Sequence, residues 1–244
     1  MSKQLFSFKQ FEIDQTNCAM KVNTDGVLLG AWAGSGGSIK NTTSTAILDI
    51  GTGTGVIALM LAQRFHEAEI DAVEIDKLAA TTAAVNFQAS AFAGRLKAFP
   101  LNIEHYFMVY PEKQFDLIVS NPPFFVDSLK SENQAKQTAR HTDTYFFDLL
   151  CQLAAKHLKP DGRFCVILPL DTAAILLQFA QKFGLYPSEI LNVSSFPDCK
   201  PHRQLLSLSF QPQEVRYSSL SIYEAEKVYH PAYRALLQNF LTIF

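Results

Sequence analysis

The chain alternates short apolar runs with longer helix-prone stretches over most of its length. A short apolar run bounded by glycine, proline or polar residues is typical of a buried strand. Strands that alternate with helices in this way indicate an α/β fold, in which a parallel sheet is covered by helices on both faces. The expected strands are 46–50, 70–75, 96–101, 115–120 and 163–168, and the expected helices are 56–64, 77–91, 145–158 and 173–183.

The C-terminal part of the chain departs from this pattern. The apolar runs 190–196 and 205–211 are separated by a turn that contains proline and basic residues and is too short for a helical crossover. They therefore predict an antiparallel hairpin on an otherwise parallel sheet. A Lys-Pro-Asp-Gly turn at 159–162 is expected to end the preceding helix, and a last helix is expected over 232–241.

The N-terminal part also has a pattern of its own. Apolar residues alternate between positions 6 and 13, which predicts a small hairpin. The apolar stretch 27–32 follows Asn23, Thr24 and Asp25, residue types that commonly cap the start of a helix. We expect one domain over 1–244, with 1–44 as a hairpin and helix lid and 45–244 as the sheet-containing core.

Composition and charge narrow the class of protein. The 244 residues are 48% hydrophobic and 18% charged, which argues against intrinsic disorder. The net charge of −2 means that a nucleic acid would have to meet a local basic patch. The longest apolar run, 56–62, is too short for a membrane span, and no signal peptide is recognisable. The four cysteines are far apart, so we expect no zinc site, no disulfide framework and a reduced, cytoplasmic location.

The first candidate site is the segment Asp49-Ile50-Gly51-Thr52-Gly53-Thr54-Gly55, between an expected strand and an expected helix. Ligands of open α/β sheets bind at the carboxyl ends of strands, and glycines let them approach the backbone. The spacing is G-x-G-x-G rather than the G-x-G-x-x-G of dinucleotide sites, and Asp49 suits a positively charged ligand better than a pyrophosphate. The alternative is a glycine-rich turn without a ligand.

The second candidate is Glu74, which ends the next expected strand and lies 23 residues after Gly51. An acidic side chain about 20 residues after such a loop is well placed to accept two hydrogen bonds from a ribose diol. The alternative role is to cap the following helix. Asp76 is nearer to that helix, so we expect Asp76 to be the cap and Glu74 to be free for a ligand.

The third candidate is Asn121-Pro122-Pro123-Phe124, directly after the strand 115–120. The two prolines lack N–H groups and have a fixed φ, so they hold the local carbonyls rigidly. The side-chain carbonyl of Asn121 and the main-chain carbonyl of Pro122 can both accept hydrogen bonds from one planar NH₂ group, and Phe124 offers a face for stacking. An ordinary Asn-Pro turn is the alternative, but the position beside the glycine loop favours a functional site.

With these motifs the chain resembles the class I S-adenosylmethionine-dependent methyltransferases that have an N-P-P-[FY] site. The segment 21–32, Lys-Val-Asn-Thr-Asp-Gly-Val-Leu-Leu-Gly-Ala-Trp, narrows the resemblance, together with 139–141 and 200–203. It is similar to the bacterial tRNA(Val) methyltransferases that modify N6 of the adenosine at position 37 of the anticodon loop. The resemblance extends from about residue 6 to 210 and implies a Rossmann-like, mostly parallel sheet of seven strands.

The resemblance implies roles for individual residues, with S-adenosylmethionine as cofactor and tRNA as partner. In relatives an Asp accepts a hydrogen bond from the cofactor's adenine, and here Asn102 stands in its place. The adenine of the substrate would be held by the catalytic residues Asn121, Pro122, Pro123 and Phe124. The cofactor-binding residues would be Lys21, Thr24, Asp25, Asp49, Gly51, Gly53, Gly55, Glu74, Asn102 and Asn121, and the RNA-binding residues Arg140, His141, Lys200 and Arg203.

Other functions remain open at this point. Adenine in DNA or a glutamine amide in a protein could be the methyl acceptor, although each is expected to require an additional recognition region. A non-catalytic RNA-binding protein or an NAD-dependent oxidoreductase are the alternatives outside methyl transfer. The G-x-G-x-G spacing and the Asn-Pro-Pro-Phe loop both argue against the oxidoreductase. We expect a monomer that uses no metal.

Overall fold

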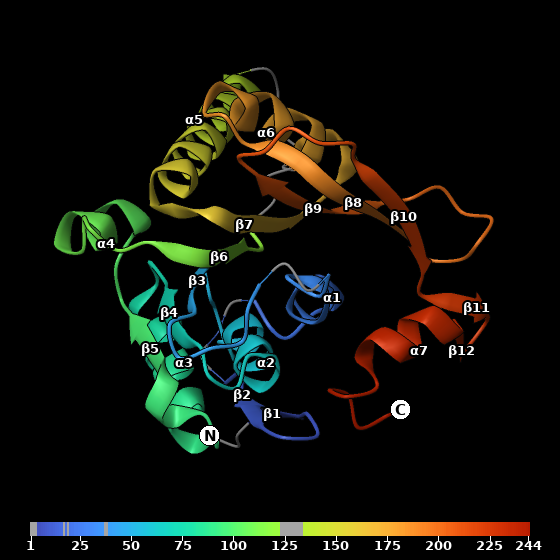
Figure 1. Cartoon of the computed structure of the whole chain (residues 1–244). Helices are drawn as coiled ribbons and strands as arrows, with labels where there is room; N and C mark the ends of the chain where they lie inside the picture. Colours follow the sequence, from blue (N-terminus) through green and yellow to red (C-terminus); the bar gives the residue numbers. More distant parts are fainter. Residues whose placement is uncertain (1–3, 17, 19, 37–38, 123–133) are drawn as a thin grey trace.

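The computed structural model describes residues 4–122 and 134–244, except 17, 19, 37 and 38, and the side chains of 134–144 also lie outside the description. The described residues form a central sheet of eight strands in the order β10-β8-β9-β7-β6-β3-β4-β5 (Figure 1). Within this sheet β9 alone is antiparallel to its neighbours. The strands are β3 (Ala46–Ile50), β4 (Glu69–Val73), β5 (Leu96–Phe99), β6 (Phe115–Ser120), β7 (Leu158–Leu168), β8 (Tyr186–Ser194), β9 (Arg203–Ser209) and β10 (Arg216–Ser221).

Helices cover both faces of the sheet, as the alternation of strands and helices predicts (Figure 1). One face packs against α1 (Thr24–Trp32), α2 (Val56–Arg64), α3 (Lys77–Ala89) and α7 (Pro231–Leu237). The other face packs against α4 (Ile103–Val109), α5 (Gln134–His157) and α6 (Leu170–Lys182).

The strands contribute side chains to the two faces in turn, because successive residues of a strand point to opposite sides. Leu117 belongs to the hydrophobic cluster under α1 and α2, whereas the next residue, Ile118, belongs to the cluster under α4, α5 and α6. Both side chains are fully buried, so this sheet is covered on both sides.

Smaller elements complete the fold. The expected N-terminal hairpin is present as β1 (Leu5–Ser7) and β2 (Glu12–Asp14), and the expected hairpin near the C-terminus is formed by β8 and β9. A short 3₁₀ helix, η1 (Ala93–Arg95), precedes β5. A second two-stranded ribbon consists of β11 (Tyr223–Ala225) and β12 (Val228–Tyr229).

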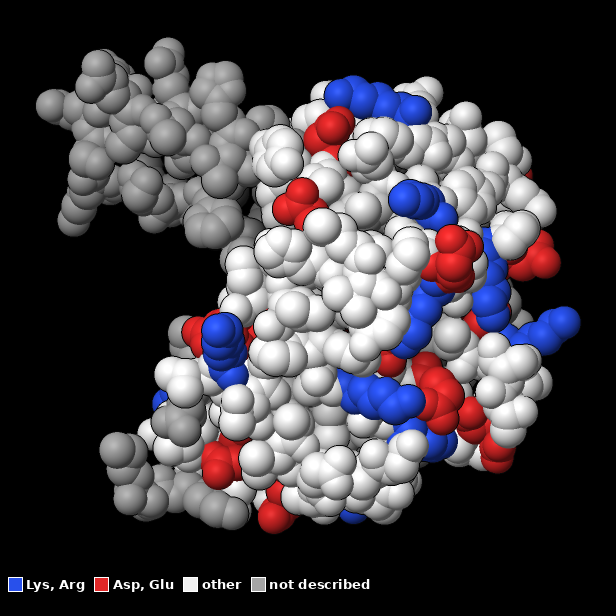
Figure 2. Space-filling view, turned by 90° about the vertical axis from the view of Figure 1, so that its left-hand side faces the viewer, with Lys and Arg blue, Asp and Glu red and all other residues white. Residues whose placement is uncertain are grey.

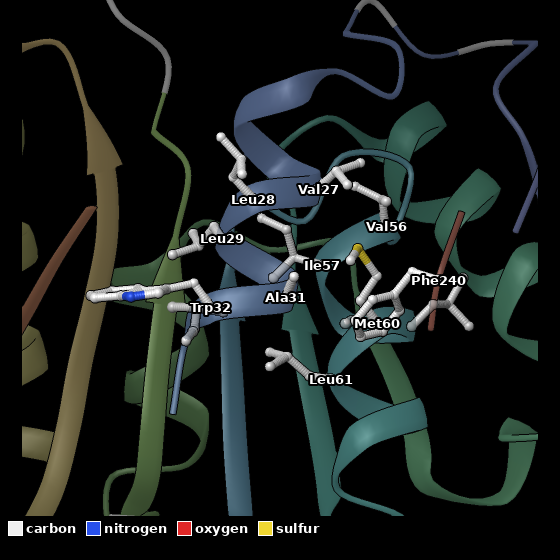
Figure 3. Close-up of a cluster of buried hydrophobic side chains, with 14 of the residues drawn as sticks. Val27, Leu28, Leu29, Ala31, Trp32, Val56, Ile57, Met60, Leu61 and Phe240 are labelled. Atoms are coloured by element: carbon white, nitrogen blue, oxygen red, sulfur yellow. The ribbon is translucent and has the colours of Figure 1, made fainter. Parts of the chain in front are cut away.

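Helix α1 is part of the core rather than a cover over it. Its residues from Gly26 to Trp32 are all buried, and it lies against α2 (Figure 3). The two helices approach closely at Gly30, where an added Cβ would be 2.9 Å from the Cβ of Met60. A lid that includes α1 would have to break this packing.

Several elements differ from the sequence-based expectation, and helix α4 was not expected at all. The sheet has an eighth strand, β10, which was missed because four of its six residues are exposed and polar or aromatic. The helix expected at 145–158 begins earlier, at Gln134. The turn expected at 159–162 lies within β7 as an irregularity, since Leu158 pairs with Phe115 and Arg163 pairs with Leu117. No helix among the described residues is both long and apolar enough to cross a membrane.

Candidate active site

The register of the sheet brings the predicted motifs to one edge. Ile50 of β3 pairs with Val73 of β4 on one side and with Ser120 of β6 on the other. The residues that follow these strands, Glu74 and Asn121 among them, therefore leave the sheet next to the glycine loop after Ile50. This is the carboxyl edge, where ligands of open α/β sheets bind.

The glycine loop has a backbone that side chains would strain. Gly51, Gly53 and Gly55 have φ values of 74°, 54° and 85°. At Gly51 and Gly53 an added Cβ would have no described atom within 4 Å, so the loop faces open space there. At Gly55, which precedes α2, an added Cβ would lie 2.5 Å from Cε1 of Phe87. The first two glycines thus leave room for a ligand, and the third lets α2 and α3 pack closely.

Asn86 of α3 forms hydrogen bonds to the glycine loop, a role that was not predicted from the sequence. Its buried amide donates hydrogen bonds to the carbonyl oxygens of Thr54 (2.9 Å) and Asp14 (3.0 Å). Its Oδ1 accepts a hydrogen bond from the N–H of Asp14 at 2.9 Å. The side chain of Asn86 therefore joins the glycine loop to β2. No local sequence pattern indicates such a long-range contact.

Asp49 lies at the end of β3 and is fully buried. Its Oδ2 accepts a hydrogen bond from Oγ1 of Thr52 at 2.6 Å, whereas its Oδ1 has no hydrogen-bond partner within the described part of the chain. Burial, which disfavours the charged form, raises the pKa of Asp49 to about 7, although the hydroxyl of Thr52 and the backbone N–H of Ala58 act in the opposite direction. A cation bound beside the loop would both satisfy the free oxygen and favour the ionised carboxylate.

Glu74 follows β4 and accepts two backbone hydrogen bonds, each of 2.9 Å. Oε2 accepts from the N–H of Gly53, and Oε1 accepts from the N–H of Asp76. Glu74 does not cap α3, as expected, but its side chain is not unengaged, because it orders the loop. Two bonds still leave acceptor capacity on a carboxylate. The expectation for Asp76 is confirmed, since its Oδ1 accepts from the N–H groups of Leu78 and Ala79 and caps α3.

Asn121 and Pro122 follow β6. The preceding Ser120 donates its hydroxyl to the carbonyl oxygen of Ile50 at 2.9 Å, which fixes the end of β6 against β3. Oδ1 of Asn121 is buried and has no hydrogen-bond partner among the described residues. Because an unpaired buried carbonyl is costly, this atom is a strong candidate to accept from a substrate. Pro122 is buried, and Pro123 and Phe124 lie outside the described residues.

Asn102 precedes α4 and caps it. Its Oδ1 accepts a hydrogen bond from the N–H of His105 at 2.7 Å, so this side chain has a capping role in addition to the cofactor contact expected from the resemblance. Between the two acidic residues after β4, Ile75 is 72% exposed, so an apolar side chain lies open next to Glu74. The sequence did not predict this exposure, because Ile75 ends an apolar run that was expected to be a buried strand.

The segment 21–25 adjoins the same edge. Lys21 and Thr24 are exposed, and the cap of α1 is Asn23, whose Oδ1 accepts from the N–H of Gly26 at 2.9 Å. Asp25 forms an ion pair with Arg203, the first residue of β9, over 2.8 Å.

The expected RNA contacts are only partly described. Lys200 is exposed in the turn between β8 and β9, and Arg203 is partly exposed at the end of that turn. The side chains of Arg140 and His141 lie outside the description. Within the described residues, no group of three or more His, Cys, Asp and Glu side chains is arranged to hold a metal ion.

Comparison with known proteins places the chain in a class. Residues 37–183 match the family model described as the methyltransferase small domain. A structure described as a predicted O-methyltransferase from Agrobacterium tumefaciens has a TM-score of 0.68 at 16% identity, covering 88% of this chain and 96% of that one. The human methyltransferase 10 domain containing protein has a TM-score of 0.51 at 19% identity, covering 69% of this chain and 72% of that one. The fold and the glycine loop thus define a class I methyltransferase.

Curated relatives identify the branch of this class. The tRNA1(Val) (adenine(37)-N6)-methyltransferase of Pedobacter heparinus is 50% identical over 99% of this chain and 100% of that protein. The enzyme of the same name from Bacteroides fragilis is 40% identical over 98% of both chains. The chain belongs to the tRNA1(Val) (adenine(37)-N6)-methyltransferase family.

Proposed function

We propose that this protein transfers a methyl group from S-adenosylmethionine to N6 of adenine 37 in tRNA1(Val). The observation that carries the proposal is the unpaired, buried Oδ1 of Asn121, which lies at the carboxyl edge beside the glycine loop. An amino group of adenine is the kind of donor that this oxygen requires. Full-length similarity to relatives of that name supports adenine 37 as the acceptor.

The residues around the glycine loop fit S-adenosylmethionine. Gly51 and Gly53 leave open space, and the unpaired Oδ1 of Asp49 is an acceptor for a positively charged group. Glu74 would hold the ribose hydroxyls with its remaining lone pairs, and the exposed Ile75 would contact the adenine ring. Lys21, Thr24 and Asp25 would adjoin the bound molecule. When bound, this cofactor supplies an electrophilic methyl group.

The contribution of Asn121 and Pro122 is to prepare the acceptor. The lone pair of the adenine amino nitrogen is delocalised into the ring, so this nitrogen is a poor nucleophile. Hydrogen bonds from both of its N–H groups to the carbonyl oxygens of Asn121 and Pro122 would favour a tetrahedral nitrogen and localise the lone pair. Most of the rate gain would then come from positioning, and no strong general base is needed because the proton leaves after attack.

Contacts with tRNA must be local in a chain of net charge −2. Figure 2 shows the face that carries β5 and α4, where basic and acidic side chains are interspersed. Lys97 of β5, for example, forms an ion pair with Glu69 of β4 at 3.7 Å. A face of mixed sign offers little attraction to phosphate. The turn that contains Lys200 and Arg203 instead lies at the carboxyl edge, and we assign it, with Arg140 and His141, to RNA binding.

The other acceptors considered above fit less well. An adenine in an anticodon loop can leave its stack at small cost, because it is already unpaired. The curated relatives named above are tRNA methyltransferases and match this chain over nearly their full length, which supports tRNA rather than DNA or a protein as the acceptor. We expect the enzyme to act in the cytoplasm as a monomer.

Labelled-methyl transfer to total tRNA from a strain that lacks this protein tests the proposal. We expect label in N6-methyladenosine at position 37 of tRNA1(Val), and none in a transcript with guanosine at that position. Label in another nucleoside, or none in tRNA, would contradict the assignment. Equal labelling of DNA would favour the DNA alternative.

A further inference from the structure

A row of aromatic rings, which we call the aromatic ladder, extends from the end of β8 to α7. It consists of Phe196, Tyr223, Tyr229 and Tyr233. The ring centroids of successive members are 5.7, 5.1 and 5.5 Å apart, and the interplanar angles are 35°, 23° and 11°. The three tyrosine rings are thus stacked, and the ring of Phe196 is tilted against that of Tyr223.

The ladder is fixed at its inner end and partly exposed at its outer end. Tyr233 is buried, and the ring of Phe244 packs edge-on against both Tyr229 and Tyr233 at 5.0 and 6.1 Å. Phe196, Tyr223 and Tyr229 are only partly buried. Ordered aromatic rings that remain partly accessible can bind another ring without loss of much conformational entropy.

The ladder lies at the same edge of the sheet as Asn121. The N–H groups of Ile222 and Tyr223 donate to the carbonyl oxygens of Ser194 and Ser195 at 3.0 and 2.9 Å, which attaches the β11–β12 ribbon to the end of β8 (Figure 1). Strands β8 and β6 run in the same direction and are separated by β9 and β7. The register places the end of β6, Ser120, level with Ile190 of β8. The end of β8 at Ser194 is therefore three strand spacings, about 14 Å, across the sheet and four residues, about 13 Å, further along it, a separation that one RNA loop can span.

The charges around the ladder are of mixed sign, so stacking would add to RNA binding beside the contacts assigned to Lys200 and Arg203. Lys200, His202 and Lys227 are exposed near it, but so are Asp198, Glu224 and Glu226. A surface of mixed sign attracts the RNA backbone weakly, whereas every base has a flat face that stacks on an aromatic ring whatever the salt concentration.

We infer that Phe196, the outer ring of the aromatic ladder, stacks an unpaired base of the RNA loop that carries the target adenine on the ring face that Tyr223 does not cover, with Tyr223 and Tyr229 holding that ring in place. This inference rests on the proposed function. It adds a recognition surface that lies 75 residues or more after Asn121 in the chain. None of the sequence motifs described above includes this surface.

The test compares the double variant Phe196→Leu/Tyr223→Leu with wild type. Leucine keeps apolar volume but removes the ring. Binding of an unmodified anticodon stem-loop is measured by fluorescence anisotropy at several salt concentrations, and thermal unfolding and S-adenosylhomocysteine affinity are measured in parallel. Tyr217→Leu is the matched control, because Tyr217 is 70% exposed on β10 but pairs with Ile190, away from the end of that strand that leads to the ribbon.

We expect the double variant to bind the stem-loop at least about fivefold more weakly, with an unchanged slope of affinity against salt and unchanged cofactor affinity. Tyr217→Leu and Phe196→Tyr should bind as wild type does, the latter because it keeps the ring. Equal affinity of the double variant and wild type would overturn the inference, as would weaker binding with a reduced salt slope. This readout needs no catalysis, so it is distinct from failure of the proposed function, which would appear as absent methyl transfer by wild type.

Discussion

Arg203 Nε donates a hydrogen bond to Asp25 Oδ2 over 2.8 Å, although the two residues are 178 positions apart. The pair joins the start of β9 to the first turn of α1, and the side chains are only 28% and 18% exposed. Arg203 Nη1 also donates to the carbonyl oxygen of His202. The guanidinium group therefore positions the N-terminus of α1 beside the site, in addition to any contact with RNA.

A double-mutant cycle tests this coupling. Arg203→Ala and Asp25→Ala should each lower the free energy of unfolding, and the double variant should lose about 1 kcal/mol less than their sum. Chemical denaturation measures all three values. Strict additivity would show that the ion pair contributes nothing to the position of α1.

Glu74 is expected to affect cofactor binding in two ways, since it both offers acceptor oxygens and orders the N–H of Gly53. Glu74→Ala should weaken binding of S-adenosylhomocysteine by about 1.5–3 kcal/mol, the scale of hydrogen bonds to a charged group. Glu74→Gln keeps one acceptor oxygen and should lose less. Calorimetry that finds unchanged affinity in the alanine variant would leave Glu74 with a purely structural role.

Asp49 should give both stability and cofactor binding a dependence on pH. Burial raises the pKa of this carboxyl from 3.8 to about 7, so the folded chain holds an additional proton between these values. The contribution of Asp49 to stability is therefore largest below pH 3.8 and falls, by on the order of a few kcal/mol, as the pH rises to about 7. Ionisation at the same time creates the charge that attracts a cation.

Affinity for S-adenosylmethionine should accordingly rise as the pH increases through about 7 in wild type. Asp49→Asn cannot ionise, so its affinity should be lower and nearly independent of pH in this range. Thermal unfolding of the free protein gives the matching stability curve. A wild-type affinity that is flat across neutral pH would contradict the raised pKa.

Gly55 should tolerate no side chain. Its φ is 85°, and an added Cβ would lie 2.5 Å from Phe87, so Gly55→Ala should destabilise the fold by about 1–3 kcal/mol. Gly94→Ala is the control, because an added Cβ there has no described atom within 4 Å. Equal thermal unfolding temperatures for the two variants would show that the loop relaxes without strain.

The fold was largely predictable because its signals are local. Apolar runs marked β3, β4 and β6, and the cap at Asp76 followed from its distance to α3. The polar strand β10 and the β11–β12 ribbon gave no such signal, since their residues are mostly exposed and depend on contacts with distant strands.

The site was predicted in part for the same reason. Motif positions placed Asp49 and Asn121 at one edge, which the register of β3 and β6 confirms. The partners of Asp25 and the loop contacts of Asn86 depend on residues far away in the chain, and a single sequence does not display such pairs. The hydrogen bond between Gly53 and Glu74 was hidden for the same reason.

The most direct test of the account is the effect of Asn121→Ala on two quantities measured side by side. Single-turnover methyl transfer to tRNA1(Val) should fall by roughly 100-fold or more, the scale of losing a hydrogen-bonding group that acts at the reacting atoms. The affinity for S-adenosylhomocysteine should stay within a few-fold of wild type, because the free Oδ1 of Asn121 is assigned to the acceptor adenine. Wild-type turnover in the variant, or an equal loss of turnover and cofactor affinity, would contradict this assignment.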